Sequence, residues 1–532
     1  MKPPGAEARA ARVEIYDTTL RDGTQREGLS LSVSDKLAIA RRLDAIGVSY
    51  VEAGWPGSNP KDAEVFLRAR DIPWTGAELV AFGATRRVNV AVEDDPSLRA
   101  LVDSGTRVCT IFGKSSTLHV AEVLRTSMDE NLVLIEESVR WLVGEGRRVI
   151  YDAEHFFDGF ELDAAYALET LQAACRGGAE RLVLCDTNGG TLPWRVGAVV
   201  AEIARSVSLP VGIHAHDDVG CAVASSLAAV RAGASQVQGT LNGYGERCGN
   251  ANLCALIPTL ELKMGRRCVR PGALPELRAL AHFVAEIANI APDEHAAYVG
   301  RSAFAHKGGV HVAAVRRNPA SYNHIDPTLV GNETRIVVSE LSGKAAVALK
   351  AGELGVAATD DAHGEVLALV KEGEAVGFAY ESAEASVALL LARRAPSYVA
   401  PFQLLDLRVL VGVKDQGSFA EATIKLLVQG EVVHTASEGA GPVNAIDSAL
   451  RKALVPLFPE VAGVKLEDYK VRILDGGDGT SAVVRVLIEH GDGAHRWSTV
   501  GASRNILEAS WQAIADGVEY GFLERRKATE AA

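Results

Sequence analysis

Two histidines separated by one residue carry the strongest chemical signal in this chain of 532 residues. His214 and His216 lie in a β-rich segment, where side chains two residues apart point to the same face. Two neutral imidazoles and the carboxylate of Asp22 form a nitrogen and oxygen set that suits a divalent cation such as Mg²⁺, Mn²⁺ or Zn²⁺. The alternative is a pair of hydrogen-bonded interior histidines, but H-x-H at the end of a strand favours the metal.

A fixed cation is expected beside this metal. Arg21 precedes Asp22, and it either forms a structural salt bridge or stabilises an oxyanion that develops on a substrate; its position favours the second role. Glu52 either orients the Arg21 guanidinium in a bidentate pair or forms a plain buried ion pair, and both interpretations remain open.

The sequence Gly113-Lys114-Ser115 resembles the end of a phosphate-binding loop. The earlier glycine that such a loop requires is replaced by Val108, so we exclude this motif. Lys114 and Ser115 either meet an anionic substrate or are solvated loop residues.

These polar residues need a scaffold that brings distant segments together. From Val13 to about Leu262, short β-rich runs alternate with helical stretches, which predicts parallel strands joined by crossover helices. Eight strands are expected, in segments that begin at Val13, Tyr50, Glu78, Arg107, Arg148, Arg181, Pro210 and Gln236. Eight β/α units in about 250 residues are typical of a (β/α)₈ TIM barrel, an α/β fold whose active face lies at the carboxyl ends of the strands.

The first helix of this barrel is expected in SDKLAIARRLDAIG, with Ser34 or Asp35 as its cap and Gly47 as its end. The first turn, LRDGTQREG, lacks the G-x-G-x-x-G of a dinucleotide-binding sheet.

Three regions are predicted. Residues 1–270 form the catalytic barrel, and residues 271–396 form a linker with helical subdomains. Residues 397–532 form an α+β domain of duplicated ββα units, because a β-hairpin, a glycine and a helix recur in this part of the chain. We expect this last domain to be regulatory and to bind a small effector.

The composition excludes several classes of function. With 55 basic and 68 acidic residues the net charge is −13, and no basic cluster indicates a nucleic-acid partner. No apolar run reaches the roughly 18 residues of a membrane span, and no secretory signal is recognisable, so we expect a cytoplasmic protein. The 7 cysteines are scattered without a C-x-x-C pair, which predicts reduced thiols.

Four motifs resemble those of the DRE-TIM metallolyase superfamily: LRDGTQREG, VEAGWPGSNPKD, HAHDDVGCAVASSLAAV and LNGYGERCGNANL. The G-E-R-x-G-N sequence is similar to that of the Claisen-condensing synthases, which include 2-isopropylmalate, homocitrate and citramalate synthases. GWPGSNPKD, YDAEHFFDGF, CDTNGG and SYNHIDPTLVGN most resemble the long citramalate-forming branch. The resemblance covers almost the whole chain.

The resemblance implies roles for individual residues. Metal ligands would be Asp22, His214, His216 and Asn250, with Arg21 polarising a ketone and Glu52 as its partner. Glu154 and Thr187 would lie near an α-keto acid.

Two further catalytic groups, His311 and Tyr322, would come from outside the barrel. They would fold back over it or reach across from a second subunit, which implies a homodimer. His311 would be the base that removes a proton from acetyl-CoA.

The implied reaction condenses acetyl-CoA with pyruvate, with isoleucine as the effector of the terminal domain. A larger α-keto acid is the close alternative, and a pocket near Phe82, Phe112, Lys114 and Tyr151 would decide between them. A 3-hydroxyacyl-CoA lyase and an inactive amino-acid-sensing scaffold are the alternatives from other classes.

Overall fold

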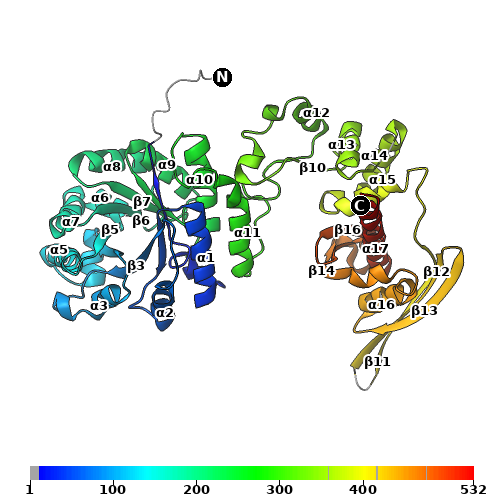
Figure 1. The fold of residues 1–532 in the computed structure, drawn as a ribbon, viewed down its shortest axis with the longest axis horizontal. Coiled ribbons are helices and arrows are strands. Elements are labelled where there is room, and N and C mark those ends of the chain that lie inside the picture. Colours follow the sequence, from blue (N-terminus) through cyan, green and yellow to red (C-terminus); the bar gives the residue numbers. More distant parts are fainter. Residues whose placement is uncertain (1–10, 357–358, 415–416, 475, 532) are drawn as a thin grey trace. The chain divides into compact units, whose positions relative to one another are not determined.

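The protein is described by a computed structural model that covers residues 11–356, 359–414, 417–474 and 476–531. The chain forms two compact units, which Figure 1 colours along the sequence. The first unit comprises the chain up to Phe304 together with Ile325–Glu333, and the second comprises Ala305–His324 and the chain from Thr334 onward.

The first unit is built on a closed parallel barrel, which confirms the predicted (β/α)₈ fold. Each strand pairs with the next one along the chain, and β8 closes the ring onto β1. The strands are β1 (Glu14–Asp17), β2 (Tyr50–Gly54), β3 (Glu78–Ala84), β4 (Val108–Lys114), β5 (Arg148–Glu154), β6 (Arg181–Asp186), β7 (Val211–Ala215) and β8 (Gln236–Gly239).

Helices surround the barrel in Figure 1 and bury their apolar faces against the outward side chains of the strands. The principal ones are α1 (Val33–Ile46), α2 (Pro60–Ala69), α3 (Pro96–Asp103), α5 (Met128–Gly144), α7 (Ala164–Gly177), α8 (Pro193–Ser206), α9 (Ala222–Ala232) and α10 (Leu253–Leu262). Helix α11 (Leu277–Ile287) and the short α4 (Thr117–His119) and α6 (Phe156–Leu162) also belong to this unit.

The start of α1 differs from the expected one. Ser32 is the N-cap, and its side chain and that of Asp35 form a reciprocal capping box, whereas Ser34 lies inside the helix. Gly47 ends the helix as predicted, with a left-handed φ of 86°.

The second unit begins with a helical part and ends with the predicted duplication. The helices are α12 (Gly309–Arg317), α13 (Lys344–Glu353), α14 (Asp360–Ala375) and α15 (Glu384–Ala392), with a short pair of strands, β9 (Ala305–His306) and β10 (Arg335–Ile336).

Each C-terminal repeat contains three antiparallel strands and a helix, so the structure adds one strand to each predicted ββα unit. The first repeat is β11 (Gln403–Lys414), β12 (Gly417–Val428), β13 (Glu431–Gly439) and α16 (Pro442–Leu454). The second is β14 (Lys465–Ile473), β15 (Val484–Gly491), β16 (Arg496–Ser503) and α17 (Ile506–Ala531).

The predicted boundaries at 270/271 and 396/397 stay predictions. Arg393, which follows α15, forms ion pairs with Asp516 and Glu519 of α17, so α15 is tied to the terminal repeats. In the described part of the chain, no helix combines the length and the apolarity that a membrane span requires.

Candidate active site and metal centre

The predicted site residues meet at the carboxyl ends of the barrel strands, around a cavity of ≈ 250 Å³. This is the face where TIM barrels carry their active sites. The cavity is lined by Arg21, Asp22, Gln25, Trp55, Phe82, Phe112, Asp152, Glu154, Cys185, Thr187, His214, His216 and Glu246.

Asp22, His214 and His216 are buried, and their ligand atoms all lie within 4.8 Å of one another. Nε2 of His214 lies 3.2 Å from Oδ2 of Asp22 and 3.3 Å from Nε2 of His216. Nε2 of His216 lies 4.0 Å from the same oxygen of Asp22. One carboxylate oxygen and two imidazole nitrogens therefore converge from the loop after β1, from β7 and from the residue that follows β7.

The surroundings favour the forms of these groups that bind a cation. Burial would raise the pKa of Asp22, but Arg21 and then His214 hold it well below its usual range. Burial and the neighbouring His214 lower the pKa of His216 to about 4, so that imidazole is neutral at pH 7. Burial would lower the pKa of His214, but Asp22 beside it raises that pKa above its ordinary value.

Asn250 completes the cluster, because an isolated backbone bridge pairs its segment with His216. Its Nδ2 donates to Oδ2 of Asp22 over 2.9 Å and lies 3.3 Å from Nε2 of His214. Its Oδ1 is buried without a hydrogen-bond partner in the described structure. Rotation of the amide exchanges the two atoms and turns this oxygen towards the other ligands, so the donor set fits a divalent metal.

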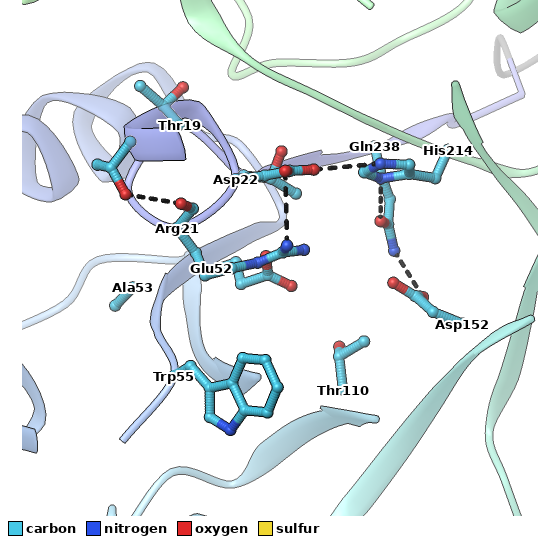
Figure 2. A network of polar contacts seen from close by, with 12 residues as sticks. Thr19, Arg21, Asp22, Glu52, Ala53, Trp55, Thr110, Asp152, His214 and Gln238 are labelled. Carbon is cyan, nitrogen blue, oxygen red and sulfur yellow. Dashed lines mark hydrogen bonds and ion pairs between the residues drawn. The ribbon is translucent and has the colours of Figure 1, made fainter. Parts of the chain in front are cut away.

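The Arg21 guanidinium is fixed on three sides. Its Nε donates to Oε1 of Glu52 over 2.5 Å, and its central carbon lies 3.6 Å from the centre of the Phe82 ring. Its NH1 lies 3.6 Å from Oδ1 of Asp22. Figure 2 marks the ion pair between these two residues with a dashed line. The other oxygen of Glu52 accepts from the hydroxyl of Tyr16 over 2.6 Å, so the carboxylate is itself held in place.

Three aromatic rings form one wall of the cavity. Phe82 and Phe112 stack at 5.5 Å, and Trp55 meets both rings edge-on at 5.7 Å. Offset and edge-on aromatic contacts of this kind make a rigid apolar surface.

Polar residues also line the cavity. Glu154 forms an ion pair with Lys114. The backbone N–H of His155 donates to Oγ1 of Thr187 over 2.9 Å, so the Thr187 hydroxyl hydrogen stays available for another acceptor.

Comparison with known proteins identifies the parts of this architecture. Residues 12–284 match the HMGL-like family, residues 298–377 match the homocitrate synthase post-HMGL domain-like family, and residues 381–522 match the LeuA allosteric (dimerisation) domain. The chain is 52% identical to the (R)-citramalate synthase of Synechocystis sp. over 95% of both chains. It is 50% identical to that of Geobacter sulfurreducens over 96% of this chain and 97% of the relative. The chain belongs to the (R)-citramalate synthase family.

Membership of this family makes the chain an enzyme, a transferase of the acyl-condensing type. A 2-isopropylmalate synthase of Methanocaldococcus jannaschii is also similar, at 30% identity over 97% of this chain and 96% of the relative.

Three residues that the sequence analysis placed near the substrate, Lys114, Ser115 and Tyr151, do not line the cavity. Side chains alternate along a strand, so Phe112 faces the cavity from β4 and Asp152 faces it from β5. Tyr151 consequently points away and is fully buried in the core of the first unit. Ser115 is buried outside the lining, where its hydroxyl accepts from Thr170 over 3.1 Å.

His311 and Tyr322 lie in the second unit, where their rings stack at 4.2 Å. Their roles at the barrel stay predictions.

Sequence reasoning missed Gln25, Trp55, Asp152, Cys185 and Glu246 in the lining, together with Gln238 behind His214. Trp55 directly follows Gly54 at the end of β2, and that position was a usable signal. The position of Asp152, two residues before Glu154 on one strand, was another.

Proposed function

We propose that this enzyme condenses acetyl-CoA with pyruvate and water to give (R)-citramalate and CoA. The observation that carries the proposal is the convergence of Asp22, His214 and His216 beside an immobilised Arg21 in the cavity, within a chain about half identical to citramalate synthases along nearly its whole length.

Asp22, His214, His216 and Asn250 would hold a divalent ion, Mg²⁺, Mn²⁺ or Zn²⁺. When bound, this ion supplies Lewis-acid polarisation of the keto acid and a template for its carboxylate and carbonyl oxygens. The remaining work falls to side chains of the protein.

Arg21 would stabilise the oxygen that becomes an alkoxide when the new carbon–carbon bond forms. Its guanidinium is already oriented by Glu52 and Phe82, so little reorganisation accompanies the reaction. The free hydrogen of the Thr187 hydroxyl would donate to the carboxylate of the keto acid. The aromatic wall of Trp55, Phe82 and Phe112 would enclose its methyl group.

A base must remove a proton from the methyl group of acetyl-CoA. We assign this step to His311, coupled to Glu154 or a water molecule, with Tyr322 beside it. Delivery of these residues from another subunit would require a homodimer, which the match to the LeuA dimerisation domain supports. Hydrolysis of the thioester then releases CoA and makes the sequence irreversible.

The direct test measures CoA release from acetyl-CoA by the purified full-length protein, with pyruvate, 2-ketoisovalerate or 2-ketoglutarate, before and after removal of metal with EDTA. Release with pyruvate that EDTA abolishes and Mn²⁺ or Mg²⁺ restores is the expected result. Preference for a bulkier keto acid would contradict the assignment of pyruvate as the substrate and keep the condensation reaction. Inactivity with all three keto acids would contradict the proposal, and cleavage of a 3-hydroxyacyl-CoA would replace it with the lyase reaction.

We further propose that isoleucine regulates the enzyme through the LeuA domain at residues 381–522. The same assay with isoleucine, and with leucine as the control, tests this regulation. Inhibition by isoleucine at lower concentration than leucine is expected, and equal insensitivity to both would contradict it.

A further inference from the structure

A glutamine and an aspartate stand behind His214, on the side away from the other expected ligands. Oε1 of Gln238 lies 2.8 Å from Nδ1 of His214, and Nε2 of Gln238 donates to Oδ1 of Asp152 over 3.0 Å. Figure 2 shows this chain of contacts running from His214 to Asp152. All three side chains are buried, and Gln238 has no exposed surface.

The chemistry of His214 and Asp152 determines which group donates in each of these two hydrogen bonds. Burial raises the pKa of Asp152 to about 7, and above that pH its ionised carboxylate only accepts hydrogen bonds, so it requires the NH₂ end of the Gln238 amide to face it. The carbonyl oxygen of Gln238 must then face His214. Because this oxygen only accepts, Nδ1 of His214 must carry a proton, and in the neutral imidazole Nε2 then carries the lone pair.

That lone pair is directed into the ligand cluster. Nε2 is the atom of His214 that lies 3.2 Å from Asp22 and 3.3 Å from His216. A metal ion binds an imidazole nitrogen that carries no proton, and partners of the other ring nitrogen set the tautomer and the ring orientation.

We propose that Asp152 is a positioning residue that acts through Gln238 to hold His214 in the Nδ1-protonated tautomer, ready to bind a divalent ion. The inference rests on the metal site of the proposed function. It assigns Asp152 to that site although this residue also lines the substrate cavity.

Asp152→Asn keeps the shape of the side chain but no longer requires one orientation of the Gln238 amide. In Asp152→Asn the new amide can donate as well as accept, so Gln238 can turn its NH₂ end towards His214. Nδ1 would then accept, the proton would move to Nε2, and the ligand position would be blocked. We expect Asp152→Asn to weaken Mn²⁺ binding by about 10- to 100-fold.

A second substitution should restore the native order of donors and acceptors in these hydrogen bonds. In the double variant Asp152→Asn with Gln238→Glu, the asparagine NH₂ donates to the new carboxylate, whose other oxygen accepts from Nδ1 of His214. The net charge is also that of the native pair. We expect Mn²⁺ affinity within about threefold of the native protein.

Loss of a buried carboxylate alone is controlled by Asp17→Asn. Asp17 is also fully buried in a barrel strand, but its carboxylate accepts from the backbone N–H and the hydroxyl of Thr19. This variant should bind Mn²⁺ like the native protein.

The experiment titrates the metal-free full-length proteins with Mn²⁺ at pH 8, without substrates, and reads free Mn²⁺ by electron paramagnetic resonance. Histidine-labelled samples add long-range ¹H–¹⁵N spectra, with His214→Gln to assign the signals, and these report the tautomer directly. Weakened binding in Asp152→Asn with a shift to the Nε2-protonated form, and recovery of both in the double variant, supports the proposal.

Native affinity in Asp152→Asn would overturn the proposal, and so would failure of the folded double variant to recover. A native protein that binds no Mn²⁺ would overturn the metal site itself. A native protein that binds Mn²⁺ but does not condense acetyl-CoA with pyruvate would contradict the proposed reaction and leave this inference standing.

Discussion

Arg21 illustrates how a single side chain can be restricted before any substrate arrives. Its Nε is engaged by Glu52, its planar face lies against Phe82, and NH1 is directed towards Asp22. Burial would lower the pKa of Arg21, but Glu52 and Asp22 raise it above its ordinary value, so the guanidinium stays charged. A lysine has neither the planar face nor the fork that these contacts use.

Arg21→Lys should therefore lower kcat by about 10²- to 10³-fold, the usual effect of losing one preorganised donor to an oxyanion. Mn²⁺ affinity should change by less than about threefold, because Arg21 is not a ligand. Steady-state CoA release and Mn²⁺ titration measure the two quantities. Arg41→Lys, an exposed substitution on α1, is the matched control. An unchanged kcat in Arg21→Lys would show that the Arg21 guanidinium does not stabilise the transition state.

The expected metal ligands at the strand ends could be predicted from the sequence, whereas the residues that hold them in place could not. His214 and His216 reveal themselves by type and spacing, and closure of the barrel brings Asp22 to them. The part played by Gln238 depends on the register between β7 and β8, in which His214 pairs directly with Gln238. Nothing local in the sequence specifies that register, because it follows from the shear of the closed barrel.

Strand β1 carries a buried acid that links its end to the loop after β8. Asp17 accepts from the backbone N–H and the hydroxyl of Thr19, and Oγ1 of Thr19 accepts from the backbone N–H of Leu241 over 2.8 Å. Burial raises the pKa of Asp17 to about 7, above the ordinary value of 3.8. Between these pH values the folded protein holds a proton that the unfolded chain has released.

The contribution of Asp17 to the free energy of unfolding should consequently decrease as the pH rises from about 4 to about 7. Asparagine can keep both contacts with Thr19 but does not ionise. Asp17→Asn should therefore gain stability relative to the native protein as the pH increases, and the difference should level off above pH 7. Urea unfolding of both proteins at pH 4.5, 6 and 8, monitored for the barrel, measures this difference. A difference that does not vary with pH would exclude ionisation of Asp17.

At the scale of elements, periodicity was sufficient for the barrel but not for every detail. The eight strands and Gly47 were predicted because hydrophobic runs and a left-handed glycine are local signals. The cap of α1 was expected at Ser34 or Asp35. The structure places the N-cap at Ser32, with Asp35 as its capping-box partner, and these reciprocal bonds are what distinguish Ser32 from Ser34. The prediction of ββα units omitted the strand that precedes each hairpin, because its pairing with the hairpin depends on tertiary packing.

At the scale of the whole molecule, each unit contains its own hydrophobic core. The largest core cluster of the first unit runs through the barrel and its helices to Val330. The second unit contains one core that combines both terminal repeats and another that joins α13, α14 and α15 to Val500 of β16. Removal of the chain after residue 396 would open this last core, so substitutions probe regulation more cleanly than truncation.

Separate cores predict two unfolding transitions that respond to different perturbations. Arg393 binds Asp516 over 2.6 Å and Glu519 over 2.8 Å, and both acids would be left without this partner in Arg393→Ala. We expect a loss of about 3 kcal/mol, near the low end for a buried pair, because 33% of the Arg393 side chain is exposed. Mn²⁺ at a hundred times its Kd should stabilise only the barrel, by about 2.7 kcal/mol.

Differential scanning calorimetry of the full-length protein resolves these effects. Arg393→Ala should lower the midpoint temperature of one transition. It should leave unchanged the midpoint temperature of the other transition, which Mn²⁺ raises. Arg408→Ala is the control in the same unit, because Arg408 is 78% exposed and its pair with Asp406 should contribute less than about 1 kcal/mol. A single transition that both Mn²⁺ and Arg393→Ala shift would show that the two units unfold as one, and any signal from the terminal domain would then pass through a cooperative molecule rather than between independent parts.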